Sequence, residues 1–391
     1  MPLPKMKIQT RVSSIMSFLI SLALVIQTGL VFYGYCSAAE VETRVQGINR
    51  DASAAREQMP ESKFVLVPIP VSNPTVGVGL TLAGIYLHGR EQAEEEGPTT
   101  TTGLGVMYTS NESWLVGAFH DGYYFNDFMR LNLAAGYGEL HLKYYGTGND
   151  SILQENPLEF KATSSLFLPR LLFELPWDNV YLGMKYMYVG IENSLDLPRP
   201  PGVNLPEFSF RTDTAGLGLV GVYDTRDNNL WPKTGSWLEL TGMNYGEHFG
   251  GDYHYNKGIV KFAQYHQVAT PLVFVYRIDG QFISGHAPFW DLAQIKLRGF
   301  PFGRYLDDNS ITAQIETRWN VYKNWTITAF GGGGRIGGSI SDIGSTPTRW
   351  AGGAGVRYNV GGKHKLNIGI DVTYAEDQVE VYFQVGDWLA K

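Results

Sequence analysis

From residue 63 onward the chain consists of short segments in which apolar and polar residues alternate, and this pattern constrains its fold most strongly. In Lys365–Tyr374 the apolar residues are Leu366, Ile368, Ile370, Val372 and Tyr374, and the polar face carries Lys365, Asn367, Gly369, Asp371 and Thr373. The segments Ile311–Asn320, Leu272–Phe282 and Met129–Tyr137 alternate similarly. Successive side chains of a β-strand point to opposite faces, so each segment is predicted to be a strand. A soluble β-sandwich alternates in the same way, so the pattern alone leaves two architectures open.

Further features favour a barrel in a membrane. The polar faces carry paired charges and glycine, and a mean hydropathy of −0.14 is typical when lipid-facing and lumen-facing residues alternate. Short turns alternate with long polar connections, as periplasmic turns and outer loops do. Aromatic residues gather toward predicted strand ends, as interface girdles do, at Tyr123-Tyr124, Tyr144-Tyr145, Trp231, Trp237, Trp319 and Trp325. At roughly 20 residues per strand and connection, the pattern predicts an all-β fold, a transmembrane antiparallel β-barrel of about sixteen strands.

Residues 1–39 are predicted to be a signal peptide. Three basic residues precede an apolar stretch at 15–35, and Ser37-Ala38-Ala39 then supplies the small residues that signal peptidase reads. The apolar stretch is also long enough for a retained anchor helix, and Cys36 leaves a lipoprotein anchor as another alternative. Export of a barrel predicts that the protein resides in the outer membrane of a Gram-negative-type bacterium, with the lipid bilayer as its surroundings.

The remainder of the chain is interpreted as one domain with a short lead. Residues 40–62 are polar and too few for a globular domain, so they are interpreted as a periplasmic lead before a barrel at 63–391. Cleavage after residue 39 would remove three of the 31 Lys and Arg residues and no acidic residue, changing the net charge from −7 to −10. Nucleic acid is not an expected partner, because its phosphates require basic patches.

No motif for catalysis or cofactor binding stands out. Gly331–Gly334 is rich in glycine like a phosphate loop, but no Gly-Lys-Ser/Thr follows it. The eight histidines show no metal-binding spacing. His120, His254 and His266 fall on predicted strands, and the sequence places no serine nucleophile beside them. We therefore expect no enzyme activity and assign no catalytic, cofactor-binding or metal-binding residue.

A four-residue motif, Leu297-Arg298-Gly299-Phe300, lies in a long connection that about five predicted strands follow. It resembles the arginine-glycine-aromatic loop motif of the Omp85 superfamily, also called the bacterial surface antigen family. Three other segments resemble the opening strand, an early loop and the mid-barrel strand and turn of that family; they are Pro68–Gly77, Tyr145–Asn149 and Tyr223–Asn228, the last containing Asp224, Arg226 and Asp227. The superfamily includes outer-membrane barrel-assembly and translocation-assembly proteins and two-partner secretion transporters.

The resemblance implies that the loop folds back into the lumen and that Arg298 engages polar groups on the barrel wall. A buried guanidinium is costly unless it is paired, and Glu316 lies on the polar face of the following strand, so Glu316 is the candidate partner in a latch. The alternative is a solvated loop arginine. Family members carry an aspartate in a Phe-x-Asp-x-Gly pattern, whereas Phe330 is followed by Gly331–Gly334, so we expect the second anchor to be absent and the loop to dock more loosely.

The resemblance also implies a function. Barrel-assembly members carry periplasmic POTRA domains before the barrel, and residues 40–62 cannot encode one, so the sequence is interpreted as a barrel-only member. Such a protein would insert or translocate unfolded outer-membrane or secreted polypeptides through a weakly paired seam between its first and last strands. A separate periplasmic subunit or self-association could replace the missing domains. A pore or transporter for small solutes and a structural or anchoring barrel remain as alternatives.

Overall fold

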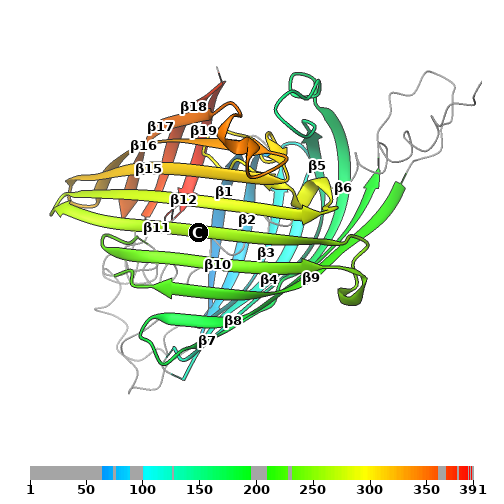
Figure 1. The fold of residues 1–391 in the computed structure, drawn as a ribbon. Coiled ribbons are helices and arrows are strands. Elements are labelled where there is room, and N and C mark those ends of the chain that lie inside the picture. Colours follow the sequence, from blue (N-terminus) through cyan, green and yellow to red (C-terminus); the bar gives the residue numbers. More distant parts are fainter. Residues whose placement is uncertain are drawn as a thin grey trace, which may run out of the picture.

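The computed structural model describes residues 64–73, 76–88, 100–125, 127–194, 209–227, 231–359, 367–376, 378–385, 387 and 389. The predicted signal peptide, 1–39, and the predicted lead, 40–62, lie outside these residues. Antiparallel strands make up most of the described chain, and Figure 1 shows them curling into one large sheet. Among the described residues, no helix is both long enough and apolar enough to cross a bilayer.

The strands in chain order are β1 (Phe64–Asn73), β2 (Gly77–Leu87), β3 (Thr101–Thr109), β4 (Trp114–Tyr124), β5 (Met129–Tyr144), β6 (Leu158–Phe167), β7 (Arg170–Glu174), β8 (Val180–Ser194), β9 (Ser209–Asp224), β10 (Gly235–Tyr245), β11 (Tyr255–Ala269), β12 (Leu272–Gly285), β13 (Ala293–Gln294), β14 (Leu306–Asp307), β15 (Asn309–Tyr322), β16 (Trp325–Gly337), β17 (Arg349–Asn359), β18 (Asn367–Ala375) and β19 (Gln378–Val385). Among the described residues, single-turn 3-10 helices lie in the connections at Glu247–Phe249 (η2), Phe289–Asp291 (η3) and Asp342–Gly344 (η4).

The large sheet has sixteen strand positions, which confirms the predicted architecture. β6 and β7 both pair with β5 on one side and with β8 on the other, so they are two halves of one interrupted strand. The interruption includes Pro169, which has no N–H to donate to a ladder. β13 and β14 form a separate small hairpin within the β12–β15 connection. Antiparallel ladders lead from β1–β2 round to β18–β19, and β1 and β19 approach within 8 Å between Cα atoms.

The alternation puts apolar side chains outside and polar side chains inside. On β10, Leu240 is 49% exposed, whereas its neighbours Glu239 and Thr241 are buried. On β15, Ile315 is 66% exposed, while Glu316 and Arg318 face inward and are almost completely buried. A soluble protein would show the reverse distribution, so the exposed apolar belt identifies the lipid-facing surface of a membrane barrel.

Two tryptophans predicted to lie in the interface girdle are inside the barrel. Trp319 and Trp325 flank the β15–β16 turn and are exposed, in agreement with the girdle. Trp231 and Trp237 are buried, and the guanidinium of Arg318 lies over the Trp231 ring at 4.1 Å from its centroid. The girdle assignment of these two residues, and of the buried Tyr144 and Tyr145, is therefore wrong. The rings of the two tryptophans stack against luminal cations, a role that their position near a strand end does not reveal.

The connection between β12 and β15 fills part of the lumen. Its η3 turn and its β13–β14 hairpin pack against the inner faces of several strands in one apolar cluster, which includes Phe289, Trp290, Phe302, Leu306, Leu140, Phe160, Met187 and Ile191. The connection runs between strand ends opposite the two-residue β11–β12 and β15–β16 turns. Short turns mark the periplasmic end of such barrels, so the cluster lies toward the outer end.

Candidate functional site

The backbone of the inward loop (286–308, between β12 and β15) places Arg298 against the barrel wall. Leu297 and Phe300 on either side are buried in a cluster with Ile336 of β16. Gly299 has a φ of +112°, and a Cβ added there would lie 3.0 Å from the Cβ of Ala375. Only glycine tolerates that backbone without strain, and only glycine lets the loop approach β18 so closely.

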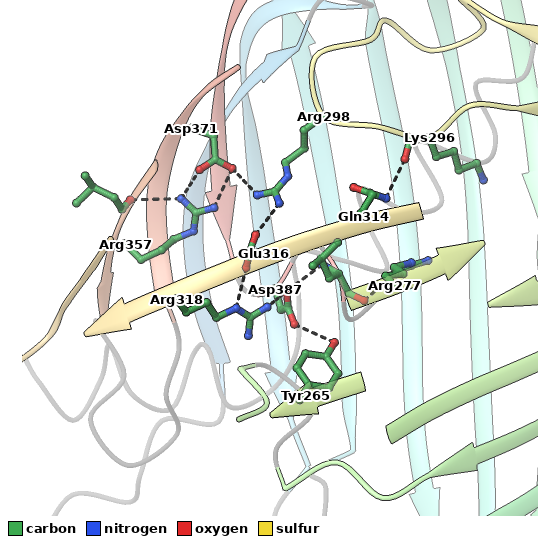
Figure 2. Close-up of polar contacts among 12 residues, drawn as sticks. Tyr265, Arg277, Lys296, Arg298, Gln314, Glu316, Arg318, Arg357, Asp371 and Asp387 are labelled. Carbon is green, nitrogen blue, oxygen red and sulfur yellow. Dashed lines mark hydrogen bonds and ion pairs between the residues drawn. The ribbon is translucent and has the colours of Figure 1, made fainter. Parts of the chain in front are cut away.

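Arg298 lies between two carboxylates that come from different strands (Figure 2). Its Nη2 donates to Oε2 of Glu316 on β15 at 2.5 Å, and its Nη1 donates to Oδ2 of Asp371 on β18 at 3.0 Å. The guanidinium also lies over the Phe330 ring, 3.4 Å from its centroid. The arginine is 2% exposed, so it is not a solvated loop residue in this structure.

The prediction of an absent second anchor is wrong, because a second carboxylate contacts Arg298. Asp371 supplies the second carboxylate from β18, and Phe330 supplies an aromatic face from β16. The glycines after Phe330 make room for the loop. A Cβ on Gly332 would lie 2.9 Å from Leu297 Cδ2, and one on Gly334 would lie 2.6 Å from Ile295 Cγ2. The glycine run therefore permits close docking.

The Arg298 contacts belong to a larger set of buried charges. Glu316 Oε1 accepts a hydrogen bond from Arg318 Nε at 2.7 Å, and Arg318 Nη2 donates to Asp387 Oδ1 at 2.5 Å. At the other end, both terminal nitrogens of Arg357 donate to Asp371, at 2.6 and 2.8 Å. We call these six residues the charge network: Arg298, Arg318, Arg357, Glu316, Asp371 and Asp387. Each is no more than 2% exposed, and the three positive and three negative charges balance.

The mid-barrel residues shape the turn between β9 and β10. Asp224 accepts from Nε and Nη2 of Arg226, both at 2.8 Å, and Asp227 Oδ1 accepts from two backbone N–H groups of the same turn at 2.7 and 3.1 Å. The carbonyl of Pro232 in this turn accepts from Arg318 Nη1 at 3.1 Å. The turn that contains the predicted motif thus contacts the charge network directly, although Asp224, Arg226 and Asp227 are not members of it.

The early loop segment predicted from Tyr145–Asn149 contacts the inward loop from the outer side. The backbone N–H of Gly148 donates to the carbonyl of Leu306 at 2.8 Å. The guanidinium of Arg304 lies over the Tyr145 ring at 4.8 Å from its centroid. Three of the four segments that carry the family resemblance therefore meet at the inward loop or at the charge network.

One loop cation has no carboxylate partner among the ion pairs of the described residues. Lys296 directs its side chain away from the charge network (Figure 2), toward the inner wall that carries Lys257 and Lys261. Burial, followed by these two like charges, lowers the pKa of Lys296 to about 7. A lysine whose folded-state pKa lies below its usual value of 10.5 destabilises the fold when protonated.

We expect Lys296→Met to stabilise the protein at low pH. The penalty is fully present below about pH 7 and fades as the pH rises toward the lysine's ordinary pKa. Because Lys296 is only partly buried, the expected gain in the free energy of unfolding is about 1 kcal/mol at pH 6 and close to zero at pH 10. Urea titration at both pH values measures it, with the exposed Lys143→Met as the control. Equal effects at both pH values would contradict the assignment.

No metal-binding or catalytic arrangement is assigned. Across the part of the chain that the structure describes, no group of three histidine, cysteine, aspartate or glutamate side chains could hold a metal ion. His120 lies 2.8 Å from Thr102 Oγ1 and 2.7 Å from Tyr124 Oη, and His266 lies 3.2 Å from Tyr276 Oη. These contacts give both rings structural partners.

Fold and site together define an outer-membrane β-barrel whose inward loop is held by a buried arginine. A family model described as the Omp85 superfamily domain matches residues 97–387, so the chain belongs to the Omp85 superfamily. Among solved structures it is similar to BamA from Haemophilus ducreyi lacking POTRA domains 1–3, with 13% identity and a TM-score of 0.55, over 84% of this chain and 70% of that one. It is also similar to CdiB from Escherichia coli, with 14% identity and a TM-score of 0.54, over 84% of this chain and 62% of that one. No curated protein matches the chain.

Proposed function

We propose that this protein inserts or translocates polypeptides at the outer membrane, and that the β1–β19 seam is where a client strand enters. The observation that carries the proposal is the edge of β1. This strand contains Pro68 and Pro70, which are two residues apart and would present their missing N–H groups on the same side of the strand. Proline is tolerated in sheets mainly where the N–H side is not needed by a neighbouring strand, which favours a weakly bonded edge there.

The position of this edge supports the proposal. One side of β1 is paired with β2 along the whole length of β1, from Phe64↔Tyr86 to Asn73↔Gly77. β19 approaches the other side of β1, but the ladders formed by the described residues do not include a β1–β19 ladder. A strand edge with fewer donors is easier to separate from its neighbour, and an extended polypeptide can bind there by adding a strand. Membership of the Omp85 superfamily agrees with this assignment.

The proposal includes the parts of the chain outside the described residues. Residues 1–39 would direct export and 40–62 would form a short periplasmic lead. A separate periplasmic subunit or self-association would supply client capture. Arg298 would keep the inward loop docked as a latch while the seam opens, with Glu316 as its partner.

The test is the folding rate of an unfolded outer-membrane barrel protein into liposomes that contain this protein. We expect faster folding than in empty liposomes, and a smaller acceleration with Arg298→Ala, which removes the loop anchor. Arg211→Ala, an exposed arginine outside the charge network, should behave as wild type. No acceleration by the wild-type protein would overturn the proposal. Ion conductance without acceleration would instead identify the pore alternative, and neither activity would favour an anchoring barrel.

A further inference from the structure

In the segment after β19, the described residues Asp387 and Leu389 are bound inside the barrel by side chains of three strands. Asp387 uses both carboxylate oxygens: Oδ1 accepts from Arg318 Nη2 at 2.5 Å, and Oδ2 accepts from Tyr265 Oη at 3.1 Å. Two residues later, the carbonyl of Leu389 accepts from Arg277 Nη1 at 2.8 Å. These contacts connect the segment to β15, β11 and β12, whereas the strand that pairs with β19 is β18.

Leu389 adds an apolar contact to these polar ones. Its side chain is completely buried in a luminal cluster that includes Tyr265, Val275 and Trp237. The backbone N–H of Leu389 also donates to Asp387 Oδ1 at 2.9 Å, so the carboxylate that binds Arg318 also contacts the Leu389 backbone. The binding surface therefore recognises three features: a carboxylate, a main-chain carbonyl and an apolar side chain two residues after the carboxylate. We call it the tail site, formed by Tyr265, Arg277 and Arg318 with the cluster around Leu389.

The charge balance shows what the tail site requires. With Asp387 in place, the charge network has three arginines and three carboxylates. Without Asp387, Arg318 would share Glu316 with Arg298, and one buried positive charge would be uncompensated. A buried guanidinium without a full partner is costly, so the vacated site favours entry of another carboxylate.

The contacts also permit exchange. The described residues after Val385 are held by side-chain donors on the barrel wall and by burial of one leucine, so their release breaks no strand ladder. Recognition depends on one side-chain carboxylate, the backbone and one apolar group, which many extended polypeptides could supply.

From these contacts we propose that the tail site is an exchangeable peptide-binding site. The segment after β19 occupies it at rest, and an extended polypeptide with a carboxylate followed two residues later by an apolar side chain binds when that segment is displaced. The site lies inside the barrel, and the segment that occupies it at rest directly follows β19, one of the two seam strands. This segment is therefore covalently linked to the seam. The inference agrees with the proposed function but does not depend on it, because peptide binding requires no insertion activity.

The test uses a fluorescein-labelled peptide with the sequence of residues 386–391 and the protein in detergent micelles. Fluorescence anisotropy is measured with the full chain and with a variant that lacks 386–391. We expect the shortened variant to bind the peptide at least tenfold more tightly, because its tail site is vacant. A peptide carrying Asp387→Asn should bind more weakly than the native peptide, by a factor of about ten or greater, because it loses charge-assisted hydrogen bonds. Equal binding of the two peptides, or equal binding by the two proteins, would overturn the proposal.

A second variant covers the case in which the shortened protein does not fold. Asp387→Asn in the full chain keeps the segment but weakens its attachment, and it should bind the native peptide more tightly than the wild-type protein does. Folding of each variant is checked by its heat-dependent mobility on gels. Liposome folding activity is measured separately. If the peptide does not bind but clients still fold faster, only the tail site is overturned. If the peptide binds but clients do not fold faster, only the proposed function is overturned.

Discussion

Replacing Arg298 with alanine is expected to lower the free energy of unfolding by about 3 kcal/mol. The substitution leaves Glu316 and Asp371 buried, each with a single arginine, and gives the charge network three carboxylates for two guanidinium groups. Removing one partner of a buried ion pair commonly costs about 3–5 kcal/mol. We expect the lower end of this range because both carboxylates retain an arginine. Urea titration of the protein in liposomes, followed by its heat-dependent gel mobility, measures the change.

Two companion variants separate charge from geometry. Arg298→Lys keeps the positive charge but cannot bond both carboxylates with a planar fork, so it should recover part of the lost stability. Arg211→Ala removes an exposed arginine near the start of β9 and should change the free energy of unfolding by less than about 0.5 kcal/mol. An Arg298→Ala protein that unfolds at the wild-type urea concentration would show that the loop docks without help from this side chain.

Asparagine at position 371 should have an effect of similar size. Asp371 is completely buried and accepts three hydrogen bonds, one from Arg298 and two from Arg357. Asp371→Asn preserves the shape but removes the charge, and it places an amide N–H₂ group among donors. We expect a loss of about 3–4 kcal/mol in the free energy of unfolding, because two buried guanidinium groups lose their shared counter-charge. The same urea titration measures it, and Asp150→Asn in an exposed loop is the control.

A double variant tests whether charge balance is the cause. Adding Arg357→Met to Asp371→Asn restores equal numbers of arginines and carboxylates in the network. Residues in direct contact deviate from additivity, so the double variant should lose at least about 1 kcal/mol less than the sum of the single variants. Strict additivity would mean that Asp371 acts through its shape and not through its charge.

The architecture was predictable because its signal is local. Alternation within a few residues determines which side chains face the lumen, and on that basis alone it places Glu316 on the polar face. Arg318 and Asp371 also occupied polar-face positions in the sequence. Their partners were not predictable, because Arg298 and Asp371 are 73 residues apart and meet only after the sheet has curled. The Phe330 pattern suggested a missing aspartate, and the fold supplies one from another strand.

Orientation at strand ends was less predictable than orientation in strand centres. Trp231 lies in the β9–β10 turn, where alternation no longer applies, so its luminal position depends on the path of that turn. Alternation also does not predict the interruption between β6 and β7. There one proline interrupts the ladder, while the two halves still occupy one strand position. Asp387 lies beyond the last strand, and neither its burial nor its partners follow from periodicity.

The span of the charge network along the chain determines when it can form. Arg298 precedes Glu316 by 18 residues and Asp371 by 73, and Arg318 precedes Asp387 by 69. The network is therefore completed only after β16, β17, β18 and β19 have taken their places. A barrel that stops before β18 and β19 are added lacks the carboxylates of Asp371 and Asp387, so its three network arginines are not fully paired. Arg298 can reach Glu316 once β15 is in place but reaches Asp371 only with β18, so its full pairing depends on the C-terminal strands.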